Sequence, residues 1–349
     1  MKKVTVIGHF GMGHVFLDGQ TVKTKIITDE LQKQLGEQQV LQIDTHGGWK
    51  TLLKAPFQVF HALKNTKNVL IFPAHNGLRI YAPLLFWLRS CFRGRKLHYV
   101  VIGGWLPEFL KKRKRLGRIL KKFDGIYVET NTMKDALDAQ GFENVFVMPN
   151  CKKLMVLTPE ELVYPAAMPY KLCTFSRVMK EKGIEDAVSA VEAVNLELGY
   201  QAFCLDIYGQ VDAGQTQWFD ELQQTFPPYI RYRGLVPFDE STEVLKNYFA
   251  LLFPTRFYTE GIPGTIIDAY AAGIPVISAR WESCADIVDE GITGIGYDFG
   301  STDQLKSIMF NIVKMPNTIL EMKESCIGKA KTYHPETAIR VLIKQLEGD

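Results

Sequence analysis

Short apolar runs alternate with longer amphipathic stretches along almost the whole chain. The first run, VTVIG at residues 4–8, precedes a stretch with apolar residues at helical spacing over residues 18–35. This alternation predicts parallel strands joined by helical crossovers, and therefore a doubly wound α/β sheet. In the first half of the chain, strands are expected at 4–8, 40–44, 68–73, 98–104, 125–130 and 145–149.

The alternation stops near residue 150 and resumes at residue 171. The intervening segment has no periodicity and contains three prolines, which is typical of a linker. Further strands are expected at 171–176, 202–209, 229–234, 248–254 and 274–279. We therefore predict two Rossmann-like domains, 1–165 and 166–334, facing across a cleft, with a helix over about 335–349 that packs back on the first.

The composition excludes several classes of protein. Of the 349 residues, 46% are hydrophobic and 23% are charged, as in ordinary globular proteins. No apolar run approaches the ~18 residues of a membrane-spanning helix, and the run after Lys3 is too short for a signal peptide. The six cysteines include no C-x-x-C pair. Neither a zinc site nor a disulfide framework is indicated, so a cytoplasmic location is expected.

Charge is distributed unevenly along the chain. Residues 1–168 hold 25 lysines and arginines against 13 aspartates and glutamates, whereas the remainder holds 16 against 25. Eight basic residues fall within Lys111–Lys122, downstream of aromatic residues such as Trp87. This pattern predicts a peripheral contact with an anionic membrane surface at its inner face. A solvated helix and nucleic acid are the alternatives, but the acidic second half and the missing nucleic-acid fold signature disfavour nucleic acid.

Residues 253–280, FPTRFYTEGIPGTIIDAYAAGIPVISAR, are the richest in candidate chemistry. A polar loop follows an apolar strand, and a helix is expected to open near Gly264. Free amides at a helix N-terminus bind phosphate, while carboxylates accept hydrogen bonds from sugar and ribose hydroxyls. The segment therefore predicts a nucleotide-sugar site. The candidate binding residues are Glu260, Gly264, Thr265, Ile266 and Asp268.

This segment resembles the E-x7-E signature of retaining GT-B glycosyltransferases of family 4, in the polysaccharide-biosynthesis branch, with Asp268 in place of the second glutamate. Arg177 and Lys182 lie in a segment similar to that family's donor-phosphate loop. Gly209 lies where the family has a glycine at the end of a strand. The resemblance implies that Glu260 orients the sugar, Asp268 the ribose, and the two cations the diphosphate. It also implies retention at the anomeric carbon by front-face attack.

No metal and no other cofactor are expected. The chain contains no Asp-x-Asp pair and no histidine-rich cluster with ligand spacing. The charge on the leaving diphosphate would then be stabilised by Arg177, Lys182 and the helix N-terminus. The nucleotide sugar, with UDP as the expected carrier, is a substrate.

The loop after the first strand, GHFGMGH, has the order G-x-x-G-x-G, which disfavours a dinucleotide site. In the family that the chain resembles, this loop faces the acceptor. His75 follows the third strand, where a histidine can hydrogen-bond a sugar hydroxyl or accept a proton. It is the fourth catalytic candidate, beside Glu260, Arg177 and Lys182. The candidate acceptor-side residues are Gly11, Gly13, Gln20 and Trp105.

The sequence therefore predicts a hexosyltransferase that moves a hexose from a UDP-sugar to a lipid-linked or oligosaccharide acceptor in the synthesis of a surface polysaccharide, such as capsule or O-antigen. Two alternatives stay open. A sugar-nucleotide epimerase of the same fold would leave the basic segment without a role. A non-catalytic glycan-binding or complex-forming subunit is favoured by Asp268 and disfavoured by intact Arg177, Lys182 and Glu260.

Overall fold

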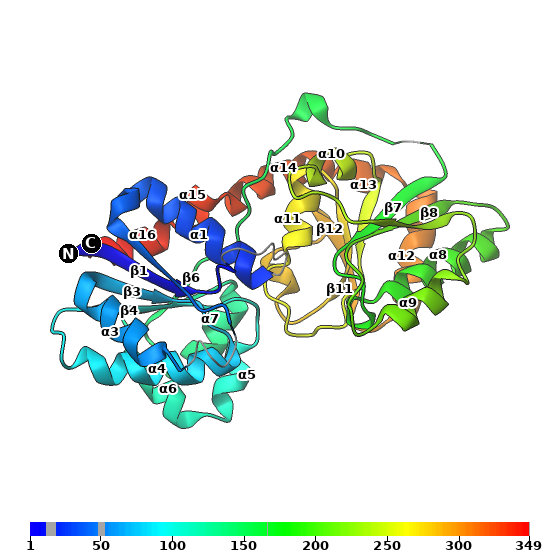
Figure 1. The fold of residues 1–349 in the computed structure, drawn as a ribbon. Helices are drawn as coiled ribbons and strands as arrows, with labels where there is room; N and C mark the ends of the chain where they lie inside the picture. Colours follow the sequence, from blue (N-terminus) through cyan, green and yellow to red (C-terminus); the bar gives the residue numbers. More distant parts are fainter. Residues whose placement is uncertain (12–18, 48–52, 166, 349) are drawn as a thin grey trace. The chain divides into compact units, whose positions relative to one another are not determined.

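The computed structural model describes residues 1–11, 19–47, 53–165 and 167–348. The chain divides into two compact units, which we call the first unit (Met1–Lys153 with Tyr333–Asp349) and the second unit (Leu154–Thr332). Figure 1 shows each of them as a sheet flanked by helices. The sequence places the boundary later, after residue 165. The structure places the residues just before this predicted boundary in the second unit, because Leu157 and Leu162 are buried with Ile327.

The first unit is built on a six-stranded parallel sheet with the order β2-β1-β3-β4-β5-β6. Its strands are β1 (Lys2–Gly8), β2 (Val40–Asp44), β3 (Thr66–Ile71), β4 (Lys96–Val100), β5 (Gly125–Val128) and β6 (Val145–Val147). The strand order reverses between β1 and β3, so this is the topological switch point, the place where ligands bind in open parallel sheets.

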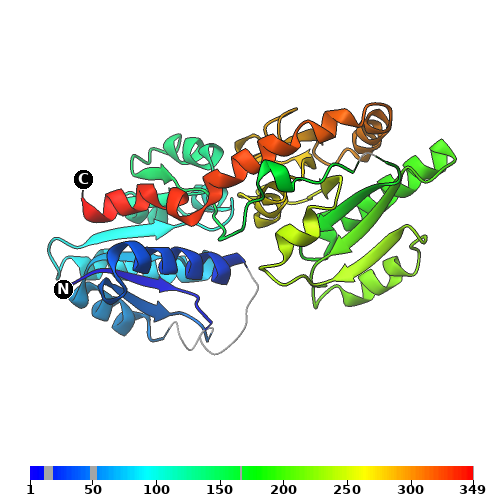
Figure 2. The same cartoon turned by 90° about the horizontal axis from the view of Figure 1, so that it is seen from above.

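Helices cover both faces of this sheet. One core is formed with α3 (Ala55–Asn65), α4 (His75–Arg89), α5 (Leu106–Lys111), α6 (Lys114–Leu120) and α7 (Asn131–Asp138). The other is formed with α1 (Gly19–Leu35), α15 (Pro335–Ala338) and α16 (Arg340–Glu347). In this second core Leu31 packs with Ile339 and Leu342, and Figure 2 shows the C-terminal helices (red) running beside α1 (blue). The end of the chain is therefore part of the first unit.

Helix α1 is less amphipathic than its apolar spacing predicts. Besides Ile27 and Leu31 it buries several threonines and Lys23. The Lys23 ammonium lies 2.6 Å from the carboxylate of Glu129, which follows β5, and both side chains are almost fully buried. A buried cation needs such a partner, because an unpaired charge in the interior costs several kcal/mol, on the order of 3–5.

The second unit contains a six-stranded parallel sheet with the order β12-β11-β10-β7-β8-β9. Its strands are β7 (Tyr170–Phe175), β8 (Phe203–Tyr208), β9 (Ile230–Gly234), β10 (Ala250–Phe253), β11 (Val276–Arg280) and β12 (Gly294–Asp298). The switch point here lies between β7 and β10. Strand β12 has no counterpart in the sequence prediction, because its segment GIGYD holds two glycines and little apolar signal.

The helices of the second unit form two groups. The first packs into one core on the sheet and comprises α8 (Ile184–Leu198), α9 (Thr216–Gln223), α12 (Thr302–Lys314) and α13 (Asn317–Leu320). The second comprises α10 (Ser241–Leu245), α11 (Gly264–Ala271) and α14 (Lys323–Ala330), with α11 packed against both others. Within the described residues, no helix is both long and apolar enough to cross a bilayer.

Candidate active site

Two loops meet at the carboxyl end of the second sheet, at the switch point between β7 and β10. The loop after β7 ends at Gly183, whose φ is +68°. A Cβ there would lie 1.8 Å from the carbonyl oxygen of Pro254, which directly follows β10. Only glycine allows both this backbone conformation and this close approach. The 3₁₀ turn Lys180–Lys182 is therefore held against the loop that carries Glu260.

Lys182 and Glu260 form an ion pair between these two loops, with both side chains less than one-fifth exposed. The Thr255 hydroxyl donates a hydrogen bond to the same carboxylate at 3.2 Å. The Lys182 ammonium also lies 5.0 Å from the ring centre of Phe257 and 5.7 Å from that of Phe253. Because both charged side chains are largely buried, charge interactions are stronger here than on an open surface. The structure thus brings together two of the predicted site residues.

Arg177 lies in the same loop after β7 but has a different partner. Its guanidinium forms an ion pair with Asp212 at 3.5 Å and is half-exposed. The loop after β8 is held alongside, because a Cβ at Gly209 would lie 1.8 Å from the carbonyl oxygen of Ser176. Arg177 and Lys182 therefore have different carboxylate partners. Its predicted role at the diphosphate stays a prediction.

The N-terminus of α11 offers two open amides. No hydrogen bond between described residues uses the backbone N–H of Gly264 or Thr265. The N–H of Ile266 donates to the carbonyl oxygen of Pro263 at 3.1 Å. The expectation that Ile266 presents a free amide is therefore wrong, because Pro263 closes a turn there. The Thr265 hydroxyl donates to the carbonyl oxygen of Phe175 and so fixes α11 to the end of β7.

Asp268 occupies a different environment from Glu260. Its side chain is only 3% exposed. The Ser241 hydroxyl, from α10, donates to its carboxylate at 3.4 Å. A ribose hydroxyl would have to reach this carboxylate below the surface, so the assigned ribose contact stays a prediction.

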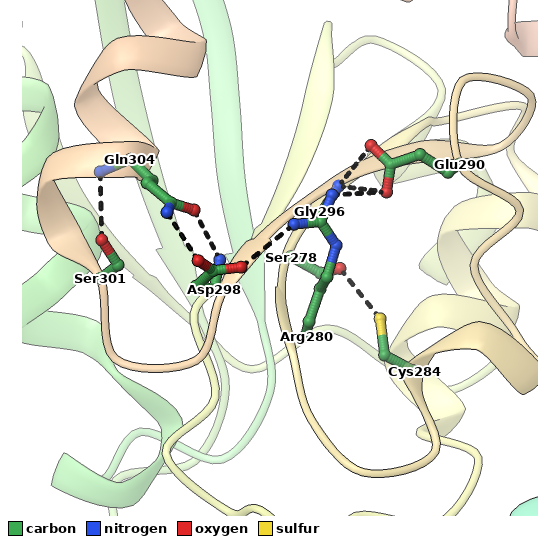
Figure 3. Close-up of polar contacts among 8 residues, drawn as sticks. All are labelled: Ser278, Arg280, Cys284, Glu290, Gly296, Asp298, Ser301 and Gln304. Carbon is green, nitrogen blue, oxygen red and sulfur yellow. Dashed lines mark hydrogen bonds and ion pairs between the residues drawn. The ribbon is translucent and has the colours of Figure 1, made fainter.

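A polar network fixes the loop that follows β11, as Figure 3 shows. Arg280, the last residue of β11, reaches Glu290 at 3.1 Å and Asp298 at 3.4 Å. Gly296, Ser301 and Gln304 complete the network, and a separate contact joins Ser278 to Cys284. Within the loop, the Glu282 N–H donates to the carbonyl oxygen of Tyr258 at 3.0 Å. This hydrogen bond joins the loop after β11 to the loop that carries Glu260.

In the first unit, two predicted residues from separate loops meet. His75 is the first residue of α4, directly beyond β3, and it is exposed. Its ring stacks on that of Trp105 with centroids 4.0 Å apart, and Phe109 contacts both rings edge-on at 5.0 Å. Partial burial, and then the charge of Arg113, lower the pKa of His75. The imidazole is therefore neutral near pH 7, the form that accepts a proton.

The remaining acceptor-side candidates are only partly described. Gln20 lies in the first turn of α1, and Gly11 has a φ of +60°. Gly13 lies outside the described residues. The structure does not test the roles assigned to these three residues.

Sequence reasoning missed three contributors to the second unit's site. Thr255 and Asp212 are the partners of Glu260 and Arg177, and each follows a strand by only a few residues. Their position just beyond the ends of parallel strands was the sequence signal that could have identified both residues. The Arg256 guanidinium donates two hydrogen bonds to the carboxylate of Asp186, at 2.9 and 2.6 Å. This bidentate ion pair connects the loop after β10 to α8. No local pattern points to a pair so distant in the chain.

Residues 169–314 match the family model described as glycosyl transferases group 1. This segment of the chain is similar to group 1 glycosyl transferases. The matched segment lies within the second unit and contains Arg177, Lys182, Glu260 and Asp268. The family-level resemblance drawn from the sequence is confirmed, while retention at the anomeric carbon stays a prediction.

A curated relative supports the same family. The chain is 22% identical over 186 residues to the amylovoran biosynthesis glycosyltransferase AmsK of Erwinia amylovora. The match covers 51% of this chain and 45% of that protein, so the chain spans less than half the length of this relative.

Several solved structures resemble this chain over 99–100% of its length. HepE of Anabaena in complex with UDP superposes with a TM-score of 0.76 at 15% identity, and all of both chains is covered. Sucrose-phosphate synthase of Thermosynechococcus elongatus gives 0.76 at 14% identity, with 99% and 98% covered. The lipopolysaccharide outer core galactosyltransferase WaaB gives 0.71 at 15%, with 99% of each chain covered. These likenesses confirm the predicted GT-B fold class.

Proposed function

We propose that the protein is a glycosyltransferase that moves a hexose from a UDP-sugar to a hydroxyl of a lipid-linked or glycan acceptor. The observation that carries this proposal is the Lys182–Glu260 ion pair at the switch point between β7 and β10. A cation that binds diphosphate and a carboxylate that binds sugar hydroxyls lie side by side there, between aromatic rings.

The proposed reaction assigns a role to each charged group. The bond from the anomeric carbon to the UDP oxygen breaks, and the acceptor oxygen forms a new bond to the same face of that carbon. The acceptor proton passes to the departing diphosphate. Lys182, Arg177 and the open amides of Gly264 and Thr265 stabilise the negative charge that grows on UDP. Glu260 orients the sugar by accepting hydrogen bonds from its hydroxyls.

This arrangement supports a reaction without a metal ion. Among the residues that the structure describes, no group of three or more histidine, cysteine, aspartate or glutamate side chains is placed to hold a metal. The two cations and the helix N-terminus supply positive charge instead. Metal independence is part of the proposal and is tested below.

Two related proteins guide the choice of substrates. HepE is solved with UDP and glucose, and AmsK takes part in amylovoran biosynthesis. By analogy we propose UDP as the carrier and a polysaccharide precursor, such as one for capsule or O-antigen, as the acceptor. A position at the inner face of a membrane remains a prediction.

Calorimetric titration with a panel of nucleoside diphosphates and nucleotide sugars tests this proposal. We expect micromolar binding of UDP and of one UDP-sugar, unchanged by EDTA and weakened by Lys182→Ala. Transfer to an acceptor, or slow hydrolysis of the bound UDP-sugar, would complete the case for an enzyme. If no nucleotide sugar binds, the enzyme assignment is overturned in favour of a non-catalytic subunit.

A further inference from the structure

A cavity of about 630 Å³ lies between α4 and the α5–α6 segment of the first unit. Six of the residues that line it are cationic: Arg79, Lys111, Lys112, Arg113, Lys114 and Arg115. None of the described residues that line it is acidic. A concave site surrounded by charges of one sign concentrates counter-ions of the opposite sign. The cavity is therefore built to hold an anion.

Most of these cations have no ion-pair partner in the described part of the chain. Lys111 pairs with Glu108, and Arg113 lies over the ring of Phe109, 3.8 Å from its centre. The other four, Arg79, Lys112, Lys114 and Arg115, form no ion pair with any residue that the structure describes, and all four are exposed. Like charges held this close repel one another, and a bound phosphate relieves that repulsion. Arginine in particular binds phosphate through two parallel hydrogen bonds.

The rest of the cavity wall is apolar, which narrows the class of ligand. Pro83, Leu116 and Ile119 line it beside the cations. On α4, Arg79, Pro83 and Trp87 follow one another at intervals of four residues, so they lie along one side of the helix. Trp87 is 69% exposed. An inorganic phosphate would use only the cations, whereas a phosphate joined to an aliphatic chain would use both walls.

The cavity adjoins the aromatic cluster that contains His75. Arg113 lines the cavity and lies over Phe109, and Phe109 in turn contacts His75 and Trp105 edge-on. A ligand anchored by its phosphate in the cavity would therefore hold its remaining part close to these rings. Aromatic faces and a neutral imidazole are well suited to bind a sugar ring and its hydroxyls.

We propose that this cavity binds the phosphate or diphosphate of an acceptor that carries an aliphatic chain. That this ligand is the acceptor of sugar transfer rests on the proposed function. That the cavity binds a phosphate joined to an aliphatic chain does not. The cations bind the phosphate oxygens, and the chain runs over Pro83 toward Trp87.

Calorimetry on the full chain, at low salt, tests the proposal with three probes. Farnesyl diphosphate carries both recognised parts, inorganic pyrophosphate only the charge, and farnesol only the chain. We expect farnesyl diphosphate to bind at least ~10-fold more tightly than either of the other two, and to weaken as salt is added. Its affinity should fall by about tenfold or more in the triple variant Lys112→Ala, Lys114→Ala, Arg115→Ala.

The matched control is the triple variant Lys2→Ala, Lys64→Ala, Lys67→Ala. It removes the same charge from exposed lysines of the same unit, at or beside the amino ends of β1 and β3. Farnesyl diphosphate should bind this control as it binds the unmodified chain. An equal loss in both triple variants, or no loss in either, would overturn the assignment to the cavity.

Two further outcomes separate the alternatives. If pyrophosphate binds as tightly as farnesyl diphosphate, the aliphatic part of the proposal is overturned and the cavity takes free diphosphate. If phosphatidylglycerol vesicles bind the protein equally well with and without farnesyl diphosphate, the cations around the cavity form a general surface for anionic lipids. The proposal is then overturned. UDP binding is measured on the same proteins. Its absence, with farnesyl diphosphate binding intact, would count against the proposed function and leave the cavity assignment standing.

Discussion

The two units share a layered architecture but differ in how many of their cationic side chains form ion pairs. In the second unit, the cations at the switch point are already paired, Lys182 with Glu260 and Arg177 with Asp212. In the first unit, the cations around the α4–α6 cavity are mostly unpaired within the described part of the chain. A paired site is held in place by its own residues before a ligand arrives. An unpaired cluster gains its partner only from outside.

The units also differ in where the histidines of the chain lie. All seven histidines of the chain lie in the first unit, and the second unit has none. Changes between about pH 5 and 7.5 should therefore act on the first unit, because histidine is the side chain whose ordinary pKa falls there. The following predictions test this difference, from the largest expected effect to the smallest.

Replacing the paired lysine should have the largest effect. We expect Lys182→Ala to lower the rate of sugar transfer or of UDP-sugar hydrolysis by about 10²–10³, since one charge stabiliser of a leaving group is lost. Lys180→Ala is the matched control, because Lys180 belongs to the same 3₁₀ turn but lies over Trp218. Equal rates in the two variants would refute the role of Lys182.

Backbone crowding at the switch point should have the next largest effect. Gly183→Ala places a methyl group on the carbonyl oxygen of Pro254, so we expect a loss of about 3 kcal/mol or more in the free energy of unfolding. Gly199 has a similar φ of +74° but open space around its Cβ position. Gly199→Ala should therefore cost only about 1–2 kcal/mol. Denaturant unfolding measures both, and equal losses would show that the close approach does not matter.

The first unit should lose stability in mild acid because of His98. This histidine is fully buried and contacts Tyr127 and Asn68 through its two ring nitrogens. Burial, followed by the charges of Lys96 and Arg89, lowers its pKa to about 3. Below pH 6.5 the unfolded chain binds a proton that the folded chain does not. Stability therefore falls as the pH falls, by about 2 kcal/mol between pH 6.5 and pH 5.

Hydrogen exchange of the β4 and β5 amides at several pH values measures this loss. His98→Gln should flatten the dependence, whereas replacing the exposed His61 by glutamine should leave it unchanged. If His98→Gln does not fold, the ring proton shifts of His98 in the unmodified chain decide the point. A ring that titrates between pH 7.5 and pH 5 would contradict the prediction.

The strand series was readable from the sequence because buried parallel strands are short apolar runs bounded by polar loops. All eleven expected strands correspond to strands of the structure, and even the weakest signal, at residues 229–234, corresponds to β9. The missing strand, β12, carries too few apolar residues to stand out. Burial in α1 was misjudged because Lys23 finds its partner in Glu129, which is distant in the chain.

The site was predictable as a set of residues but not as a set of contacts. Lys182 and Glu260 were both identified from their motifs, yet their pairing depends on β7 and β10 being neighbours in the sheet. At the N-terminus of α11, the Ile266 amide is engaged by Pro263, whereas donor binding by Gly264 and Thr265 stays a prediction. Such contacts follow from strand order and local turns, which residue spacing does not encode.

The smallest effect should come from the network of Arg280. Its ion pairs with Glu290 and Asp298 are solvent-exposed, and such pairs stabilise by about 0.2–1 kcal/mol each. We expect Arg280→Ala to lower the free energy of unfolding by less than ~1 kcal/mol and the transfer rate by less than ~10-fold. Lys306→Ala, which removes an exposed pair within one helix, is the control and should leave the rate unchanged.

This small effect distinguishes support of a loop from contact with a ligand. The loop after β11 is also held by the hydrogen bond from Glu282 to Tyr258, so it should keep its place when Arg280 is removed. A loss of rate well above tenfold, with stability little changed, would mean that Arg280 itself binds the donor. The second unit would then present a cation to its ligand that is only loosely paired beforehand, and the contrast with the first unit would weaken.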